Sequence, residues 1–178
     1  RTNGTPQFAR QARLAFIARA FLRTLVDAGY YTSENVDTFM QGISTVSSEF
    51  NDDFERFSEG LISREEFNFK YGHLRSGTYD IRSDRYDAMN FRPAPSRIKK
   101  DKVKIQKDLD ISILTQALED TQLDVPAERM AKFWISAIEQ REYFKFEFTK
   151  SLSMVLELIR KLGSILEIRT IDLSWLCV

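Results

Sequence analysis

Several residue types are scarce in this chain, and each scarcity excludes a class of structure. Among 178 residues there is one cysteine, Cys177, which can form neither an internal disulfide nor a cysteine metal site and which fits a reducing cytoplasm. Lysine plus arginine and aspartate plus glutamate number 26 each, so no net charge draws the chain to nucleic acid or to acidic membranes. No stretch is apolar enough to span a bilayer or to resemble a signal peptide. We therefore expect a cytoplasmic protein with no nucleic-acid and no membrane partner.

Familiar enzyme signatures are also missing. The sequence has no glycine-rich phosphate loop, no Gly-x-Ser-x-Gly elbow and, with a single histidine, no histidine pair for a metal. The acidic pairs Asp52-Asp53 and Glu65-Glu66 are adjacent in sequence, so the members of each pair point in different directions on a helix. We interpret them as surface charge and capping groups, and we expect no metal site and no cofactor bound by this domain.

Apolar residues are abundant instead. The chain is 43% hydrophobic and contains fourteen phenylalanines, enough material for one core, and we expect a single helical domain over residues 1–178. The first residue is Arg1 rather than methionine, and the first six residues resemble a linker. We therefore expect this domain to be an excised part of a longer multidomain protein.

The spacing of apolar residues predicts the helices of the first third of the chain. A helix is expected from Phe8 to Ala28, ended by Gly29, and its apolar positions are Phe8, Leu14, Ile17, Phe21 and Leu25. Its arginines form the other face, either solvated or turned to a neighbouring domain or a nucleotide phosphate: Arg10, Arg13, Arg19 and Arg23. Ser33 is the expected N-cap of a second helix, whose largely aromatic stripe is interpreted as core packing, with a ligand pocket as the alternative: Phe39, Ile43, Val46, Phe50, Phe54 and Phe57.

Further helices follow on either side of an irregular segment. A capping box at Ser63 and Glu66 predicts a short helix to about Tyr71. Residues 72–107 are expected to be an irregular loop and connector, with a lysine cluster that is interpreted as solvated. A helix is expected over 111–119, and Pro126 opens a longer one to Gly163, either continuous or broken at Thr149 to Ser153. A last short helix should pack Trp175 on the others. The predicted fold class is all-α, an irregular multi-helix bundle of about six or seven helices with one long polar loop.

The polar loop concentrates the candidate functional groups. We select His73, Arg75, Tyr79, Asp80, Arg85 and Asp87 as residues for substrate binding or for contact between domains. Arginine matches carboxylate or phosphate in a two-pronged geometry, so the loop is either a clasp, with Asp80 and Asp87 as internal partners, or an anion site. His73 either hydrogen-bonds backbone carbonyls or has its pKa tuned for imidazole chemistry, while Tyr79 either covers the clasp or stacks on a substrate ring. Gly72 and Gly77 are expected to supply backbone angles that other residues forbid.

The same loop carries a family resemblance. Residues 72–87, read as Gly-His-Leu-Arg-Ser-Gly-Thr-Tyr-Asp-Ile-Arg-Ser-Asp-Arg-Tyr-Asp, resemble the Gly-His-Leu-Arg-Pro-Gly-Thr-Tyr-Asp-Ile-x-Ser-Pro-Arg-Tyr-Asp signature of phosphoenolpyruvate synthase-related phosphotransferases. Flanking segments are similar to the same helical region, so the resemblance spans nearly the whole chain. Ser76 and Asp84 replace the two prolines of the signature, a change that should loosen the loop.

The resemblance implies a function for the longer protein. Such proteins place an ATP-grasp domain before this region and a swivelling phosphohistidine domain after it, so those domains are the implied partners, with ATP and Mg as cofactors of the whole protein and a phosphorylated small molecule as a ligand. The phosphorylated histidine belongs to the swivelling domain and not to His73. The implied role is acceptor binding or docking of the phosphohistidine domain, without catalysis by this domain alone. The alternatives are a standalone helical protein-interaction module and a small enzyme centred on His73, Asp80 and Asp87.

Overall fold

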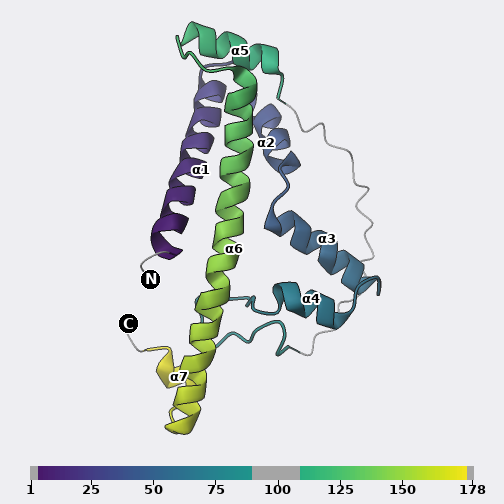
Figure 1. The fold of residues 1–178 in the computed structure, drawn as a ribbon, viewed down its shortest axis with the longest axis vertical. Helices are drawn as coiled ribbons and strands as arrows, with labels where there is room; N and C mark the ends of the chain where they lie inside the picture. The colour runs from purple at the N-terminus through teal and green to yellow at the C-terminus, as the bar shows by residue number, and fades with distance from the viewer. Residues whose placement is uncertain (1–3, 90–108, 176–178) are drawn as a thin grey trace. The chain divides into compact units, whose positions relative to one another are not determined.

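In the computed structural model the chain is all-α, as the sequence predicts, and seven helices stand in the described residues, 4–89 and 109–175 (Figure 1). The helices are α1 (Gly4–Asp27), α2 (Ser33–Gly42), α3 (Val46–Ser58), α4 (Arg64–Tyr71), α5 (Ile111–Asp120), α6 (Ala127–Ile165) and α7 (Thr170–Leu173). None of these helices is long and apolar enough to cross a membrane. The part of the predicted irregular connector that holds the prolines and the lysine cluster, within residues 90–108, lies outside the described residues.

The chain divides into two compact units, and α6 contributes to both. One unit comprises residues 1–48 and 100–144, and the other comprises residues 49–99 and 145–178. The single domain expected from the sequence stays a prediction. Each unit has its own buried apolar residues, so the two are described in turn.

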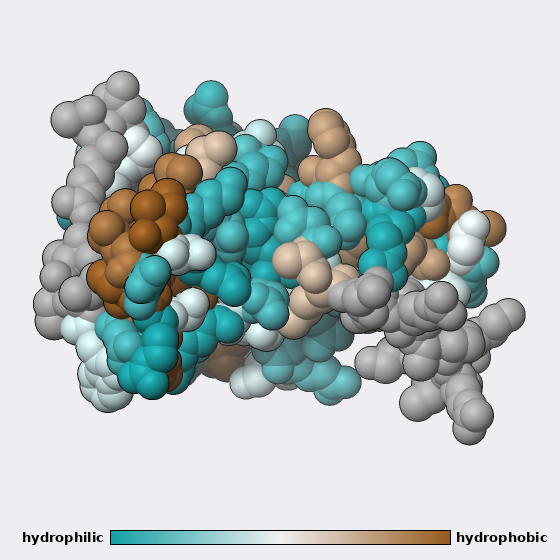
Figure 2. Space-filling model, turned by 90° about the horizontal axis from the view of Figure 1, so that it is seen from below, coloured by the Kyte–Doolittle hydropathy of each residue, from teal (hydrophilic) through white to brown (hydrophobic). Residues whose placement is uncertain are grey.

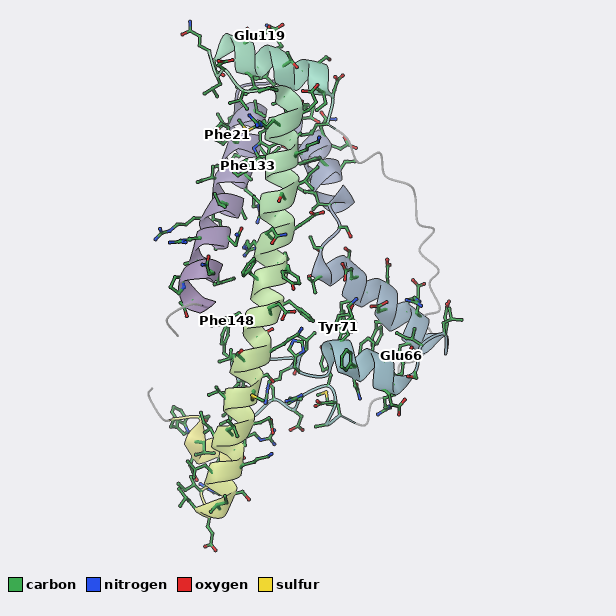
Figure 3. All side chains as sticks on the ribbon, viewed as in Figure 1. Phe21, Glu66, Tyr71, Glu119, Phe133 and Phe148 are labelled. Carbon is green, nitrogen blue, oxygen red and sulfur yellow. The ribbon has the colours of Figure 1, made fainter. Side chains whose placement is uncertain are left out.

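The first unit packs α1, α2, α5 and the start of α6 around a common core (Figure 1). Trp134 of α6 is fully buried there, and Phe21 of α1 and Phe133 of α6 pack against the core (Figure 3). On α1 the buried positions are Ala15, Ala18 and Leu22, whereas Leu14 and Ile17 are 38% and 45% exposed. Of the apolar stripe expected from the sequence, Phe21 and Leu25 do pack against the core, whereas Leu14 and Ile17 do not.

Local signals set most of the helix ends. Gly29 follows α1 with φ of 80°, a left-handed conformation that glycine adopts without strain. The N-cap of α2 is Thr32 rather than the expected Ser33, because the Thr32 hydroxyl accepts from the Asn35 amide while the Asn35 side chain accepts from the Thr32 amide. The capping box of α4 is confirmed, with Ser63 and Glu66 in the expected roles.

The second unit contains an aromatic cluster between α3 and α4. The expected single aromatic helix is divided at residues 43–45, so that Phe39 belongs to α2 and the later phenylalanines to α3. Phe50 lies 5.7 Å from Phe67 and 5.0 Å from Tyr71, measured between ring centroids, and Phe57 stacks on Phe67 at 5.0 Å. Figure 3 shows Glu66 and Tyr71 on α4. The interpretation of this stripe as packing is confirmed.

The end of α6 carries the loop and the last helix of the second unit. α6 is continuous through Thr149 and Ser153, the expected place for a break, and both side chains are buried polar groups. α7 packs on Gly163, where an added Cβ would lie 2.5 Å from Cδ1 of Leu173. Trp175 is 80% exposed, so the expectation that it packs on the other helices was wrong.

Candidate functional site

The polar loop folds back on itself at its base. The Tyr86 amide donates to the Leu74 carbonyl at 2.9 Å, and the Asp87 amide donates to the Gly72 carbonyl at 3.2 Å. Next to the first of these bonds, on the side of the tip, Arg75 and Arg85 form an isolated antiparallel bridge. The chain therefore leaves α4 and returns beside its own exit, and we call residues 72–76 and 83–87 the base of the loop and residues 77–82 its tip.

The two glycines of the loop provide space. Gly72 has right-handed helical angles, φ of −57° and ψ of −26°, and its Cβ would lie 2.9 Å from Cβ of Asp87. A Cβ on Gly77 would lie 2.9 Å from Cβ of Asp80 and 2.9 Å from Oγ of Ser83. The positive φ angles of described glycines are at Gly29 and Gly60. The expectation that the loop glycines supply unusual backbone angles was wrong, because they are required by close approach instead.

Arg75 fixes the base of the loop to α6. Its guanidinium donates to Oγ of Ser153 at 3.3 Å, to Oε1 of Glu157 at 2.5 Å and to the Ser83 carbonyl oxygen. The residue is 6% exposed, and its charge is neutralised within the fold by Glu157. The expected pairing of Arg75 with Asp80 or Asp87 was therefore wrong, and this arginine has no face turned to solvent for an anion.

A second ion pair joins the same two elements. Asp84 of the loop accepts from Arg160 of α6 at 3.0 Å, and Arg160 also lies 3.4 Å from Oε1 of Glu157. Asp84 is one of the two residues that replace a proline of the resembled signature. A proline rigidifies a loop through its fixed φ, whereas Asp84 restrains the loop through a contact with a neighbouring helix.

Arg85 and Asp87 pair with each other, as the clasp alternative allows. Nε of Arg85 lies 3.0 Å from Oδ1 of Asp87, and a second guanidinium nitrogen lies 2.5 Å from Oδ2. The two side chains keep 26% and 35% of their surfaces exposed. This two-pronged pair closes the base, and it leaves part of each group open to water.

His73 is a packing residue in this structure. Its ring meets Phe146 edge to face at a centroid distance of 4.8 Å, and within the described residues its buried Nε2 has no hydrogen-bond partner. Burial lowers the pKa of His73 to about 4, helped by the charges of Lys150 and Arg85. An imidazole with that pKa is neutral at pH 7 and a poor proton acceptor, so acid-base chemistry at His73 gains no support.

The tip of the loop is exposed beside the end of the chain. Tyr79 is 68% exposed, and Asp80 accepts from Nε of Arg82 at 2.9 Å. Residues 77–82 and Ser174 and Trp175 line a hollow of about 550 Å³. The hydrogen bonds from Arg82 lower the pKa of the Asp80 carboxyl, so Asp80 carries a negative charge at neutral pH. Two aromatic rings, one carboxylate and one guanidinium thus surround a single open space.

The sequence reasoning missed the partners of the base on α6. Thr149, Ser153, Glu157 and Arg160 recur at spacings of four, four and three, which places them on one helical face. Ser153 and Glu157 bond Arg75, and Arg160 bonds Asp84. A polar stripe inside an otherwise apolar helix is a signal that could have identified this face.

A second polar cluster was also missed, at the junction of α3 and α4. Lys70 lies 3.0 Å from Asp53 and 3.1 Å from Glu49, and the Tyr71 hydroxyl donates to Asp53 at 2.9 Å. Burial raises the pKa of Tyr71 to about 12. Burial alone would raise the pKa of Asp53 too, but hydrogen bonds from Lys70 and Tyr71 lower it. Every group of this cluster has a partner, so we interpret it as a fastening of α4 to α3.

Two further observations bear on function. Across residues 4–89 and 109–175, no group of three or more histidine, cysteine, aspartate or glutamate side chains is arranged to hold a metal ion. No protein-family model, curated protein or solved structure matches the chain.

Proposed function

We propose that the chain is the central helical domain of a phosphoenolpyruvate synthase-like, ATP-dependent phosphotransferase, and that it binds the phosphoryl acceptor or docks the phosphohistidine domain without catalysing transfer alone. ATP and Mg then belong to the other domains of a longer cytoplasmic protein. The motif resemblance of residues 72–87 is the starting point of this proposal.

The observation that carries the proposal is the contrast between the base and the tip of the loop. The Arg75 guanidinium donates to Ser153 and Glu157 inside the fold, and the pair of Arg85 and Asp87 closes the base of the loop. The tip, by contrast, is exposed, and its residues Tyr79, Asp80 and Arg82 line the hollow together with Trp175. A recognition loop needs this combination, because a fixed base lowers the entropy lost when the exposed tip binds a ligand.

The predicted site residues then have two different roles. His73, Arg75, Arg85 and Asp87 position the loop, and Tyr79 and Asp80 contact the acceptor or the docking domain. Arg82 joins them, since its exposed guanidinium can exchange Asp80 for a phosphate or carboxylate oxygen. Phosphoryl transfer depends chiefly on positioning and charge neutralisation, which such a loop can supply to a reaction that other domains catalyse.

The test is a ligand titration of this chain with inorganic phosphate, phosphoenolpyruvate, pyruvate and ATP. We expect saturable changes in the NMR signals of the Trp175 indole and the Tyr79 ring with at least one of the first three. Arg82→Ala should abolish the response. The matched control is Arg23→Ala, since Arg23 is also an exposed arginine paired with a nearby aspartate, Asp27, but lies on α1. Absence of a saturable response to all four compounds would count against acceptor binding.

A standalone protein-interaction module is the second candidate. The observation in its favour is a row of exposed apolar side chains on the last third of α6. The complete reading frame separates the two candidates: a neighbouring ATP-grasp domain supports the phosphotransferase, and a gene that encodes this helical domain alone supports the module.

A further inference from the structure

The last third of α6 exposes an apolar stripe to solvent. Six large apolar side chains between residues 154 and 166 are each about half exposed or more, from 49% at Val155 to 76% at Ile165: Met154, Val155, Leu158, Leu162, Ile165 and Leu166. Seen from the side where α6 ends and α7 lies, hydrophobic residues gather in a patch on the left of Figure 2. Large apolar patches of this kind mark interaction surfaces on folded proteins.

The stripe has the spacing of a helix-pairing seam. Val155, Leu158, Leu162 and Ile165 are separated by three, four and three residues, the repeat that keeps one face of a helix against a partner helix. The charged Glu157 and Arg160 are turned to the loop, where they bond Arg75 and Asp84. Lys161 is the one exposed charged residue between Ser151 and Leu166. The exposed face is therefore suited to another helix with an apolar stripe.

The order of the stripe is symmetric about position 160. In an antiparallel pair of identical α6 helices centred there, Val155 faces Ile165 and Leu158 faces Leu162. A parallel pair in register would instead set each residue against its own counterpart. Antiparallel helices also bring opposite ends of their dipoles together. The stripe is thus complementary to a second copy of itself, and the helix dipoles favour the antiparallel orientation.

We propose that two copies of this chain associate through the last third of α6, packed antiparallel about a two-fold axis near Arg160. The stripe is about 20 Å long, from a rise of about 1.5 Å per residue. Its exposed apolar area in two copies is on the order of 1,000 Å², the size of a weak, concentration-dependent interface. This association is independent of whether the tip of the loop binds a ligand.

The test is the molecular mass of the 178-residue chain in solution, measured by sedimentation equilibrium from low to high micromolar concentration. We expect a monomer that converts to a dimer as concentration rises. Leu158→Glu should raise the dissociation constant at least about tenfold, because it puts a charge in the centre of the seam. The matched control is Leu61→Glu, since Leu61 is 66% exposed outside α6, and it should leave the dissociation constant unchanged.

Orientation is tested by cross-linking in a Cys177→Ser background. Mixing chains that carry Leu158→Cys with chains that carry Leu162→Cys should give a disulfide between the two kinds of copy under mild oxidation. Each variant alone should cross-link poorly. A monomer at every concentration, or a dimer unaffected by Leu158→Glu, overturns the proposal. The stripe would then be a contact surface for another domain or another protein. Efficient cross-linking of the Leu158→Cys chain with itself overturns the antiparallel arrangement.

Discussion

Removing the guanidinium of Arg75 should destabilise the second unit more than removing any exposed arginine. In Arg75→Ala the buried ion pair with Glu157 is lost, and so are the hydrogen bonds to Ser153 and to the Ser83 carbonyl. The side chain of Arg75 is 1% exposed and that of Glu157 is 29% exposed. The variant therefore leaves a cavity, an unpaired buried hydroxyl and a partly buried carboxylate without its main partner.

The size of the effect follows from these contacts. Breaking a fully buried ion pair by removing one partner costs about 3–5 kcal/mol. Because Glu157 is partly solvated and Arg160 remains beside it, we expect about 2–4 kcal/mol for Arg75→Ala. Arg75→Lys should lie between this variant and the wild type, since lysine keeps the charge but cannot match three separate acceptors.

Urea unfolding followed by far-UV circular dichroism measures the change. The matched control is Arg82→Ala, because Arg82 lies in the same loop but its ion pair with Asp80 is exposed, and we expect it to leave the free energy of unfolding nearly unchanged. If Arg75→Ala and Arg82→Ala lowered the free energy of unfolding equally, Arg75 would not be the residue that fixes the loop.

Three further predictions concern the surroundings of the loop. The pKa of His73 is about 4 in the folded chain, below the ordinary histidine value of 6.5, so the unfolded chain binds the proton first and stability should fall as pH drops from 6.5 toward 4. After allowance for partial exposure the loss is about 1–2 kcal/mol. NMR titration of this single histidine measures the pKa on which the prediction depends, and a titration midpoint above pH 6 would contradict the prediction. Gly72→Ala should destabilise by about 1–3 kcal/mol through overlap with the Asn68 carbonyl oxygen and with Asp87, whereas Gly4→Ala, with nothing within 4 Å, should be close to neutral in the same urea assay. Ser63→Ala should cost about 1 kcal/mol in thermal unfolding, since the α4 amides lose their cap, and an unchanged melting temperature would show the capping box to be dispensable.

The parts of the fold that sequence predicts well depend on neighbours in sequence. The capping box at Ser63 and Glu66 and the proline that precedes α6 act within a few residues, so their signals are complete in a short stretch of chain. The pairing of Arg85 with Asp87 is of the same kind, since the two residues are two positions apart. The capping box and the start of α6 were predicted correctly, and the pair of Arg85 and Asp87 is one of those that the clasp alternative allowed.

The failures depend on distant parts of the chain. Glu157 is 82 residues from Arg75, and no local pattern says which carboxylate a buried arginine will meet. The choice of Ala15 and Ala18 over Leu14 and Ile17 as buried positions reflects how closely α1 approaches its neighbours, which residue size alone does not reveal. Trp175 was expected to pack because it is large and apolar, yet it lies beside the hollow at the tip.

Hydrogen exchange of individual amides tests most directly whether the loop has a fixed base. The amides of Tyr86 and Asp87 donate to Leu74 and Gly72, so they should exchange as slowly as the Gly72 amide, which is bonded to the end of α4. Arg75→Ala should accelerate exchange at both positions, because it frees the loop from α6. Exchange of the Tyr86 and Asp87 amides at the rate of an unstructured peptide would contradict the fixed base, and with it the argument that the loop is built to present its tip.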